Sequence, residues 1–173
     1  MAMYLHRVGA QSRPARRSWR ERDCALYALA VGAGFAERDF VREGPAQRVY
    51  PAFVLSGVMA AEAESWPDPG FATGDYAPHE IVQGEQSLVL HAPIATNGDV
   101  DTVTRVAGIY DKGSGALVVL EVSASDRATQ APIFTATTSL FVKGHGGFGG
   151  ERGPRAERPA TPCASRRRAH APA

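Results

Sequence analysis

Five histidines are the side chains best suited to acid–base catalysis or metal binding, and they are scattered along the chain. They are His6, His79, His91, His145 and His170. No two are four residues apart, the spacing that sets two imidazoles on one helical face around a metal ion. His79-Glu80, with Glu85 nearby, could supply a general acid and base. We favour the simpler interpretation that these residues flank the start of an exposed strand, and we predict no metal site.

A nucleophile is equally hard to find. The Ser56-Gly57 pair lacks the strand, sharp turn and helix that surround the serine of a G-x-S-x-G hydrolase. Cys24 lies in an apolar segment and is expected to be a small core residue. The two cysteines, Cys24 and Cys163, are far apart and without metal-ligand spacing, so neither a disulfide scaffold nor a zinc site is expected.

Lys112 is the most interesting single residue. It stands in YDKGSG (residues 110–115), whose composition predicts a hairpin tip. A lone cation beside glycine backbone amides can bind a phosphate, whereas a solvated turn lysine would explain the same residues. The glycines of residues 144–150 also match G-x-G-x-x-G, but no amphipathic helix follows them, so we interpret this segment as a hinge.

Helices are expected in the first third of the chain. Ser18 as N-cap and Glu21 three residues later form a capping box, which predicts an amphipathic helix over residues 19–31. A short strand is expected at Asp39–Arg42. Pro51, a residue typical of the first helical position, opens a second short helix over Ala52–Glu64.

The rest of the domain is rich in β-formers. Four runs are enriched in Val, Ile, Leu and Thr: Glu80–His91, Asp99–Tyr110, Ala116–Ser125 and Ile133–Lys143. Turn residues separate them, and the short gaps predict that successive runs are antiparallel neighbours. A helix lying on a curved antiparallel sheet is the hot-dog architecture, so we predict an α+β fold with a single hot-dog domain.

Composition and charge set the boundaries of the domain and exclude several classes. The 173 residues suit one domain with a tail, and the net charge of +1 hides basic ends around an acidic middle. We expect a flexible basic lead-in (1–17), a folded domain (18–150) and a disordered Arg/Pro/Ala-rich tail (151–173). An acidic body argues against nucleic-acid binding. No apolar run is long enough to cross a membrane, and no secretory signal is apparent, so we expect a cytoplasmic protein.

Four stretches, taken together, point to a family. They are WRERDCALYALAVGAG (19–34), QGEQSLVLHAP (83–93), YDKGSGALVV (110–119) and SLFVKGHGGFGG (139–150). In this order and spacing the chain resembles the N-terminal half of hydratase 2, the R-specific enoyl-CoA hydratase of the MaoC-like dehydratase group. That group includes the hydratase part of peroxisomal multifunctional enzyme type 2 and its bacterial relatives. The resemblance covers roughly residues 9–153.

The resemblance implies a double hot-dog enzyme of fatty acid β-oxidation that hydrates trans-2-enoyl-CoA to (3R)-3-hydroxyacyl-CoA. In the family the C-terminal hot dog carries the catalytic Asp and His, in a motif similar to G-D-x-N-P-L-H. No such motif occurs in this sequence. We therefore expect a non-catalytic half that handles acyl-CoA, is inactive alone and has no catalytic residue of its own.

The resemblance also carries over substrate-binding positions. Gln83 and Gly84 match the family's His-Gly pair near bound substrate, with glutamine replacing the histidine. Lys112 matches a lysine placed to contact the CoA part of the ligand. A CoA thioester is the expected substrate, and no further cofactor is implied.

The implied partner is a second hot-dog domain, either a catalytic subunit or another copy of this chain. Two alternatives stay open, a stand-alone acyl-CoA-binding module and a truncated gene product without function. Thioesterase activity, known in other hot-dog proteins, would require Glu62 or Glu64 as its carboxylate.

Overall fold

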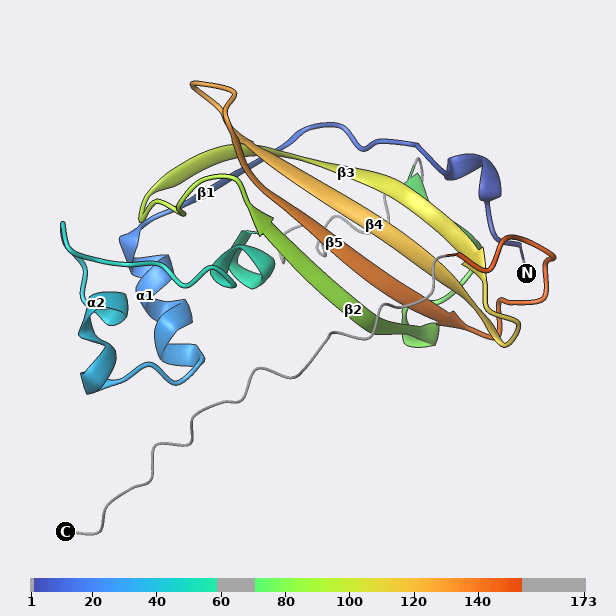
Figure 1. Cartoon of the computed structure of the whole chain (residues 1–173), viewed down its shortest axis with the longest axis horizontal. Helices are drawn as coiled ribbons and strands as arrows, with labels where there is room; N and C mark the ends of the chain where they lie inside the picture. Colours follow the sequence, from blue (N-terminus) through green and yellow to red (C-terminus); the bar gives the residue numbers. More distant parts are fainter. Residues whose placement is uncertain (1, 59–70, 154–173) are drawn as a thin grey trace, which may run out of the picture.

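The computed structural model describes residues 2–58 and 71–153 (Figure 1). Five strands form one antiparallel sheet in the spatial order β1-β3-β4-β5-β2. They are β1 (Ala15–Trp19), β2 (Ile81–Leu90), β3 (Gly98–Asp111), β4 (Gly115–Asp126) and β5 (Pro132–Lys143). The helices are α1 (Glu21–Ala30) and α2 (Arg38–Val41), with short helical turns η1 (Leu5–Arg7), η2 (Phe35–Glu37), η3 (Val54–Val58) and η5 (Pro78–Glu80).

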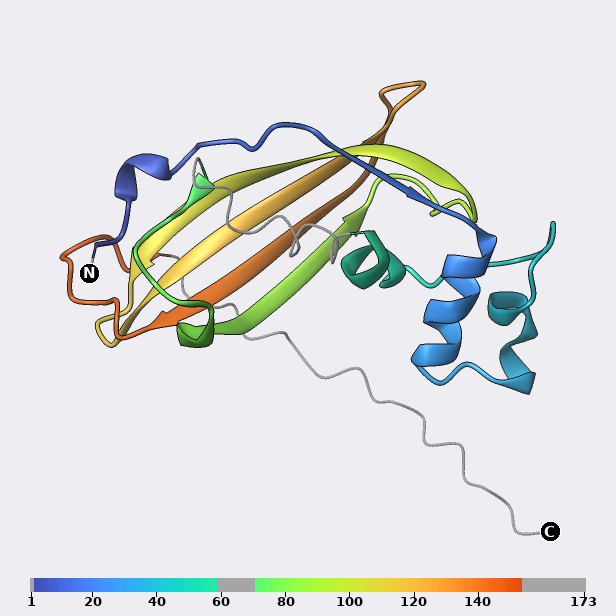
Figure 2. The same ribbon diagram turned by 180° about the vertical axis from the view of Figure 1, so that it is seen from behind.

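The helices gather at one end of the curved sheet. Both views place α1, α2 and η3 beside the end where β2 finishes and β3 begins, opposite the β3–β4 turn (Figures 1 and 2). The molecule therefore has a helical end and a turn end. The predicted α+β class is confirmed, and all four predicted β runs are strands within two residues of the expected limits.

Each end has its own hydrophobic cluster. At the helical end Trp19 and Phe53 meet edge to face, with ring centroids 5.9 Å apart, and the buried Phe134 of β5 belongs to the same cluster. At the turn end the cluster consists mostly of aliphatic strand residues, among them Val106, Val118 and Val142, together with the ring of Phe71. Buried residues alternate with more exposed ones along β4, as expected for a strand with one face on a core.

The order of the strands corrects one prediction. The first and second β runs, β2 and β3, are not neighbours, because β2 pairs with β5 and β3 pairs with β1. Residues 91–97 cross from one edge of the sheet toward the other. Local turn chemistry at Asn97-Gly98 could not reveal this, because the choice of partner depends on the whole sheet.

The start of the first helix also differs from expectation. Ser18 pairs with Asp99 inside the β1–β3 ladder, so it is not available as an N-cap. The Arg20 N–H instead donates to the Asp23 carboxylate (2.9 Å), and α1 begins two residues later than predicted. Strand β1 also gives regular structure to residues 15–17, within the segment expected to be a loose lead-in.

Two other early predictions have different outcomes. The strand predicted at Asp39–Arg42 is wrong, because α2 occupies this segment and the Arg42 N–H donates to the Arg38 carbonyl (2.9 Å). The helix predicted over Ala52–Glu64 is seen as the turn η3, and its later part lies outside the described residues. Glu62, Glu64 and the tail from residue 154 lie outside them as well.

Candidate functional site

The β3–β4 turn places Lys112 at the tip of a hairpin, as predicted. The Lys112 N–H donates to the Gly115 carbonyl (2.9 Å), and Gly113 adopts a left-handed φ of 81°, which a residue with a side chain rarely adopts. The Lys112 ammonium donates a hydrogen bond to the Arg152 carbonyl. It also lies 6.0 Å from the centre of the Tyr110 ring, so the cation is held by the backbone and an aromatic neighbour.

The carboxylate of Asp111, the residue before this lysine, is enclosed by the backbone N–H groups of three glycines. We call these N–H groups, from Gly113, Gly147 and Gly149, the glycine cage. The Asp111 Oδ1 accepts hydrogen bonds from the N–H groups of Gly113 and Gly147, both at 2.8 Å, and its Oδ2 accepts one from Gly149 at 2.8 Å. These bonds, led by that of Gly147, hold the pKa of Asp111 below the ordinary aspartate value. The residue is 7 % exposed, so the carboxylate is turned away from solvent.

Residues 144–150 are therefore not the hinge that their glycines suggested. A Cβ on Gly146 would lie 2.3 Å from the Gly113 carbonyl oxygen, so the loop backbone rests directly against the hairpin turn. Phe148 packs on the turn-end core. The glycines allow close approach of two backbones, and their N–H groups serve a carboxylate of this chain.

A second polar pair lies beneath the same loop and was not predicted. The His145 Nε2 is 3.4 Å from the Glu80 Oε2, and the imidazole, 1 % exposed, meets the Tyr76 ring edge to face. The Ala77 N–H also donates to Glu80 (2.7 Å), and these contacts hold the Glu80 pKa below its ordinary value, with the Ala77 bond the largest cause. Burial raises the pKa of Tyr76, whose hydroxyl bonds Thr73 (2.5 Å). Because the His145 imidazole is almost completely buried, we interpret it as a packing residue.

Gln83 and Gly84 lie on a different part of the sheet. The Gln83 Nε2 donates to the Gln86 Oε1 (3.1 Å) on the exposed strand β2, and Gly84 occupies a bulge where the register with β5 shifts. Strands β5 and β4 separate this bulge from Lys112, which gives a distance on the order of 15 Å. The structure therefore does not bring the predicted binding residues into direct contact.

The remaining reactive candidates have structural surroundings. His79 and Glu85 are exposed, as the simpler interpretation predicts. Cys24 is buried, with its Sγ 3.7 Å from the Thr96 carbonyl oxygen, and burial raises its pKa to about 11. A thiol with this pKa is protonated at neutral pH and is a poor nucleophile.

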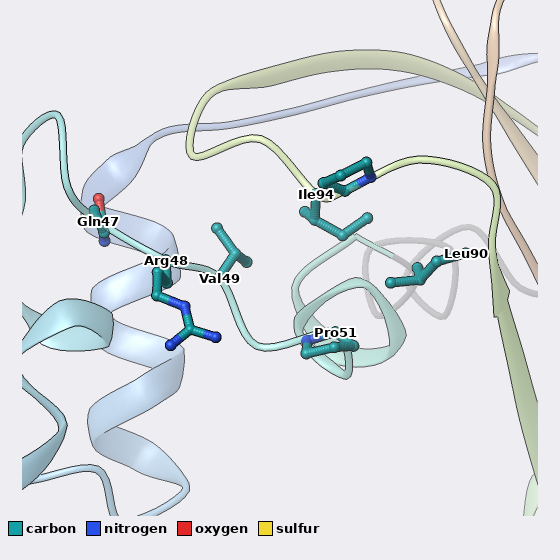
Figure 3. Close-up of a pocket in the computed structure, with 7 residues that line it drawn as sticks. Gln47, Arg48, Val49, Pro51, Leu90 and Ile94 are labelled. Carbon is teal, nitrogen blue, oxygen red and sulfur yellow. The ribbon is translucent and has the colours of Figure 1, made fainter.

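An apolar groove lies at the helical end of the sheet. It encloses about 350 Å³ and is lined by Gln47, Arg48, Val49, Pro51, Leu90, Pro93 and Ile94. Figure 3 shows the apolar side chains of Val49, Pro51, Leu90 and Ile94 around a common space, with Arg48 beside it. Leu90 pairs with Phe134 and Gly115 pairs with Lys143, so about 30 Å of strand β5 separates the groove from the Lys112 turn.

The described parts of the chain show two further negative findings. Residues 2–58 and 71–153 contain no group of three or more His, Cys, Asp or Glu side chains able to hold a metal ion. No helix in these ranges is long and apolar enough to cross a membrane.

The amino-acid sequence matches the family model of the MFE-2 hydratase 2 N-terminal domain over residues 18–144. The chain belongs to this family. The matched segment runs from the end of β1 through β5 and contains both the Lys112 turn and the groove.

A curated relative supports the assignment of this hydratase 2 domain. The chain is 36 % identical over 167 residues to 3-hydroxyacyl-thioester dehydratase Y of Mycobacterium tuberculosis, covering 94 % of this chain and 54 % of that protein. The chain spans about half the length of the curated relatives it matches. It contains no G-D-x-N-P-L-H motif.

Solved structures confirm the predicted hot-dog fold. The MaoC-like dehydratase of Phytophthora capsici superposes with a TM-score of 0.73 at 20 % identity, covering 91 % of this chain and 56 % of that one. The 3R-hydroxyacyl-ACP dehydratase complex HadBC of Mycobacterium tuberculosis gives a TM-score of 0.60 at 18 % identity, covering 78 % and 96 % of the two chains. The hydratase 2 domain thus has the architecture of the MaoC-like dehydratases.

Proposed function

We propose that this chain is the acyl-CoA-handling, non-catalytic hot-dog half of an R-specific enoyl-CoA hydratase. The full reaction would add water reversibly to trans-2-enoyl-CoA and give (3R)-3-hydroxyacyl-CoA. Membership of the hydratase 2 N-terminal family is the observation that carries this proposal. The name of the 36 % identical relative, a 3-hydroxyacyl-thioester dehydratase, supports the same substrate class.

The Lys112 turn is the proposed contact for the CoA phosphates. Its ammonium lies at the hairpin tip, and the hydrogen bonds from glycine N–H groups to Asp111 hold the backbone beside it. A preorganised cation on a rigid turn loses little conformational freedom when it binds an anion. Gln83 and Gly84, about 15 Å away on β2, would contact another part of the ligand, in keeping with the extended shape of an acyl-CoA.

The groove at the helical end is the proposed location for the far part of the acyl chain. Its lining is mostly aliphatic, which suits a hydrocarbon and offers few hydrogen-bond partners. A ligand with its phosphates at Lys112 and its apolar end in the groove would run along the length of the sheet.

The proposed partner is a second hot-dog domain that supplies the catalytic Asp and His. Among the described residues β2 pairs only with β5, and its other edge has no strand beside it. Val82 and Val89 on this strand are 47 % and 55 % exposed. A long exposed edge strand with apolar side chains favours pairing with another chain. The similar HadBC structure is a complex of dehydratase subunits, which supports a paired arrangement.

Hydration of crotonyl-CoA by the purified full chain, alone and with added partner, tests the division of labour. The partner is a second hot-dog domain containing G-D-x-N-P-L-H, sought first in the DNA directly downstream. We expect no activity alone and activity on mixing. Turnover by the isolated chain at an ordinary enzyme rate, about 1 s⁻¹ or more, would contradict the non-catalytic role.

The phosphate contact is tested by replacing the lysine. Lys112→Ala should weaken binding of crotonyl-CoA about tenfold or more and leave binding of crotonyl-pantetheine, which has no phosphates, unchanged. Lys143→Ala is the matched control, because Lys143 is the only other lysine and its backbone pairs with Gly115 beside the same turn. Equal losses in the two variants would assign the effect to overall charge and not to position.

The remaining alternatives are outcomes of the same measurements. Ligand binding without any partner-dependent activity would indicate a stand-alone acyl-CoA-binding module, whose β2 edge would pair with a second copy. Correctly folded protein that binds no acyl-CoA would indicate a product without function. The cytoplasmic location remains a prediction.

A further inference from the structure

Asp111 poses an electrostatic problem for the proposed function. It precedes Lys112 directly, and a carboxylate at this place would repel the phosphates that the lysine is proposed to bind. In the structure, however, the carboxylate is buried and hydrogen-bonded, so it does not face a ligand at the tip. Both Asp111 oxygens face glycine N–H groups, and the side chain is almost completely buried.

The carboxylate joins two segments that are distant in sequence. One of its N–H donors, Gly113, belongs to the hairpin turn, and two others, Gly147 and Gly149, belong to the loop after β5. The Asp111 N–H donates in turn to the Glu151 carbonyl (2.8 Å). Both the side chain and the backbone N–H of Asp111 are therefore hydrogen-bonded to residues 144–153.

The same loop holds the lysine side chain. The Lys112 ammonium donates to the Arg152 carbonyl, directly after the Glu151 carbonyl that receives the Asp111 N–H. A Cβ on Gly153 would lie 2.5 Å from the Tyr110 ring, so the chain lies flat against that ring. The carbonyl that orients the ammonium is thus positioned by the segment that Asp111 anchors.

We propose that Asp111 is a positioning residue for Lys112, and this inference rests on the proposed function. Its caged carboxylate fixes the hairpin turn against residues 144–153, so that the ammonium is presented at the tip for a CoA phosphate. On binding, the ammonium exchanges the Arg152 carbonyl for a phosphate oxygen. The N–H groups around the carboxylate offset the negative charge that would otherwise oppose the ligand.

Asp111→Asn separates positioning from simple electrostatics, because the two predict opposite signs. The amide has the same shape, but its NH₂ group would face an N–H donor and release one side of the cage. Removal of a negative charge beside Lys112 should strengthen phosphate binding if charge alone matters. If Asp111 positions the lysine, binding of crotonyl-CoA should weaken about tenfold while crotonyl-pantetheine binds as before.

Asp126→Asn is the matched control. Asp126 occupies the β4–β5 turn, and its Oδ1 likewise accepts hydrogen bonds from backbone N–H groups, those of Ala128 and Thr129. It lies at the other end of the strands from Lys112. This variant should lose stability in a comparable way and keep its affinity for crotonyl-CoA.

The double variant Asp111→Asn/Lys112→Ala completes the test. If Asp111 acts through the lysine, the double variant should bind crotonyl-CoA no more weakly than Lys112→Ala alone. Additive losses, or tighter binding by Asp111→Asn, would overturn the inference while leaving the phosphate contact in place. An unchanged affinity in Lys112→Ala would overturn the phosphate contact itself.

If Asp111→Asn does not fold, Gly149→Ala provides a second test. Gly149 has a left-handed φ of 76° and no atom within 4 Å of a Cβ placed there, so the substitution strains the backbone without a clash. This variant should show the same selective loss of crotonyl-CoA binding.

Discussion

The two ends of the sheet are stabilised by different interactions. At the turn end, backbone N–H groups converge on the buried Asp111 carboxylate, and the core consists mainly of aliphatic strand residues. At the helical end the large aromatic rings Trp19, Tyr27 and Phe53 pack edge to face. Exposed apolar side chains are also concentrated there, and Phe35 is 82 % exposed. One end holds a buried carboxylate beside a lysine and the other presents apolar surface, a difference that agrees with the proposed acyl-CoA ligand, which has a phosphorylated head and an apolar tail.

The largest loss of stability is expected from a substitution in the core of the helical end. Phe53→Ala removes a ring that is 2 % exposed and contacts both Trp19 and Tyr27. We expect a loss of about 3–5 kcal/mol in the free energy of unfolding, measured by urea denaturation. Phe35→Ala, at the exposed ring of η2, is the control and should change it by less than about 0.5 kcal/mol. Similar losses in the two variants would mean that aromatic packing does not stabilise this end.

The next largest loss of stability is expected from Asp111→Asn at the turn end, and its size depends on pH. Because the cage lowers the Asp111 pKa, its stabilisation is complete above the ordinary aspartate pKa of about 3.9 and is lost as pH falls through the folded-state value. The urea midpoint of Asp111→Asn should therefore lie below that of the wild type at pH 7 and approach it in acid. Asp39→Asn, an exposed carboxylate of α2, should leave the midpoint nearly unchanged at both pH values. A constant difference between wild type and Asp111→Asn would show that the cage does not depend on charge.

The sequence allowed the strands of this fold to be predicted, but not all of its contacts. Runs enriched in Val, Ile, Leu and Thr, bounded by turn residues, define β3, β4 and β5 locally, so their limits were predicted within two residues. The pairing of β2 with β5 is a property of the whole sheet. Ser18 does not cap α1 because it pairs with Asp99 in the β1–β3 ladder, and the local sequence does not reveal this distant partner.

The candidate site was predicted to a lesser extent. Lys112 was placed correctly because turn chemistry is local. The cage was missed because Gly147 and Gly149 are 36 and 38 residues from Asp111. The joint presence of a glycine-rich turn that begins with aspartate and a second glycine-rich segment was the available signal. The distance between Gln83 and Lys112 depends on strand order, which the residues alone did not reveal.

A smaller change, in ligand affinity, tests whether the groove at the helical end binds the acyl chain. Ile94→Ala removes aliphatic surface from the groove and should weaken binding of a long-chain enoyl-CoA about fivefold, through lost apolar contact of about 1 kcal/mol. Crotonyl-CoA, with its short chain, should bind as before. Val89→Ala is the control, since Val89 is exposed beside Leu90 and does not line the groove. Equal losses for both chain lengths would place the acyl chain elsewhere.

The smallest effect compares two carboxylates whose pKa values are lowered by different causes. Asp99 receives two hydrogen bonds from the Arg16 guanidinium, at 2.9 and 2.8 Å, and this pair lowers its pKa as the glycine cage lowers that of Asp111. The Arg16 and Asp99 side chains are, however, 64 % and 43 % exposed, so water and salt screen their attraction. Arg16→Gln should therefore leave the urea midpoint within experimental error, and about 1 M NaCl should remove any remaining difference. A loss as large as that of Asp111→Asn would mean that an exposed ion pair stabilises this sheet as well as a buried carboxylate does. The contrast between the two carboxylates would then lie in the number of their hydrogen bonds and not in their burial.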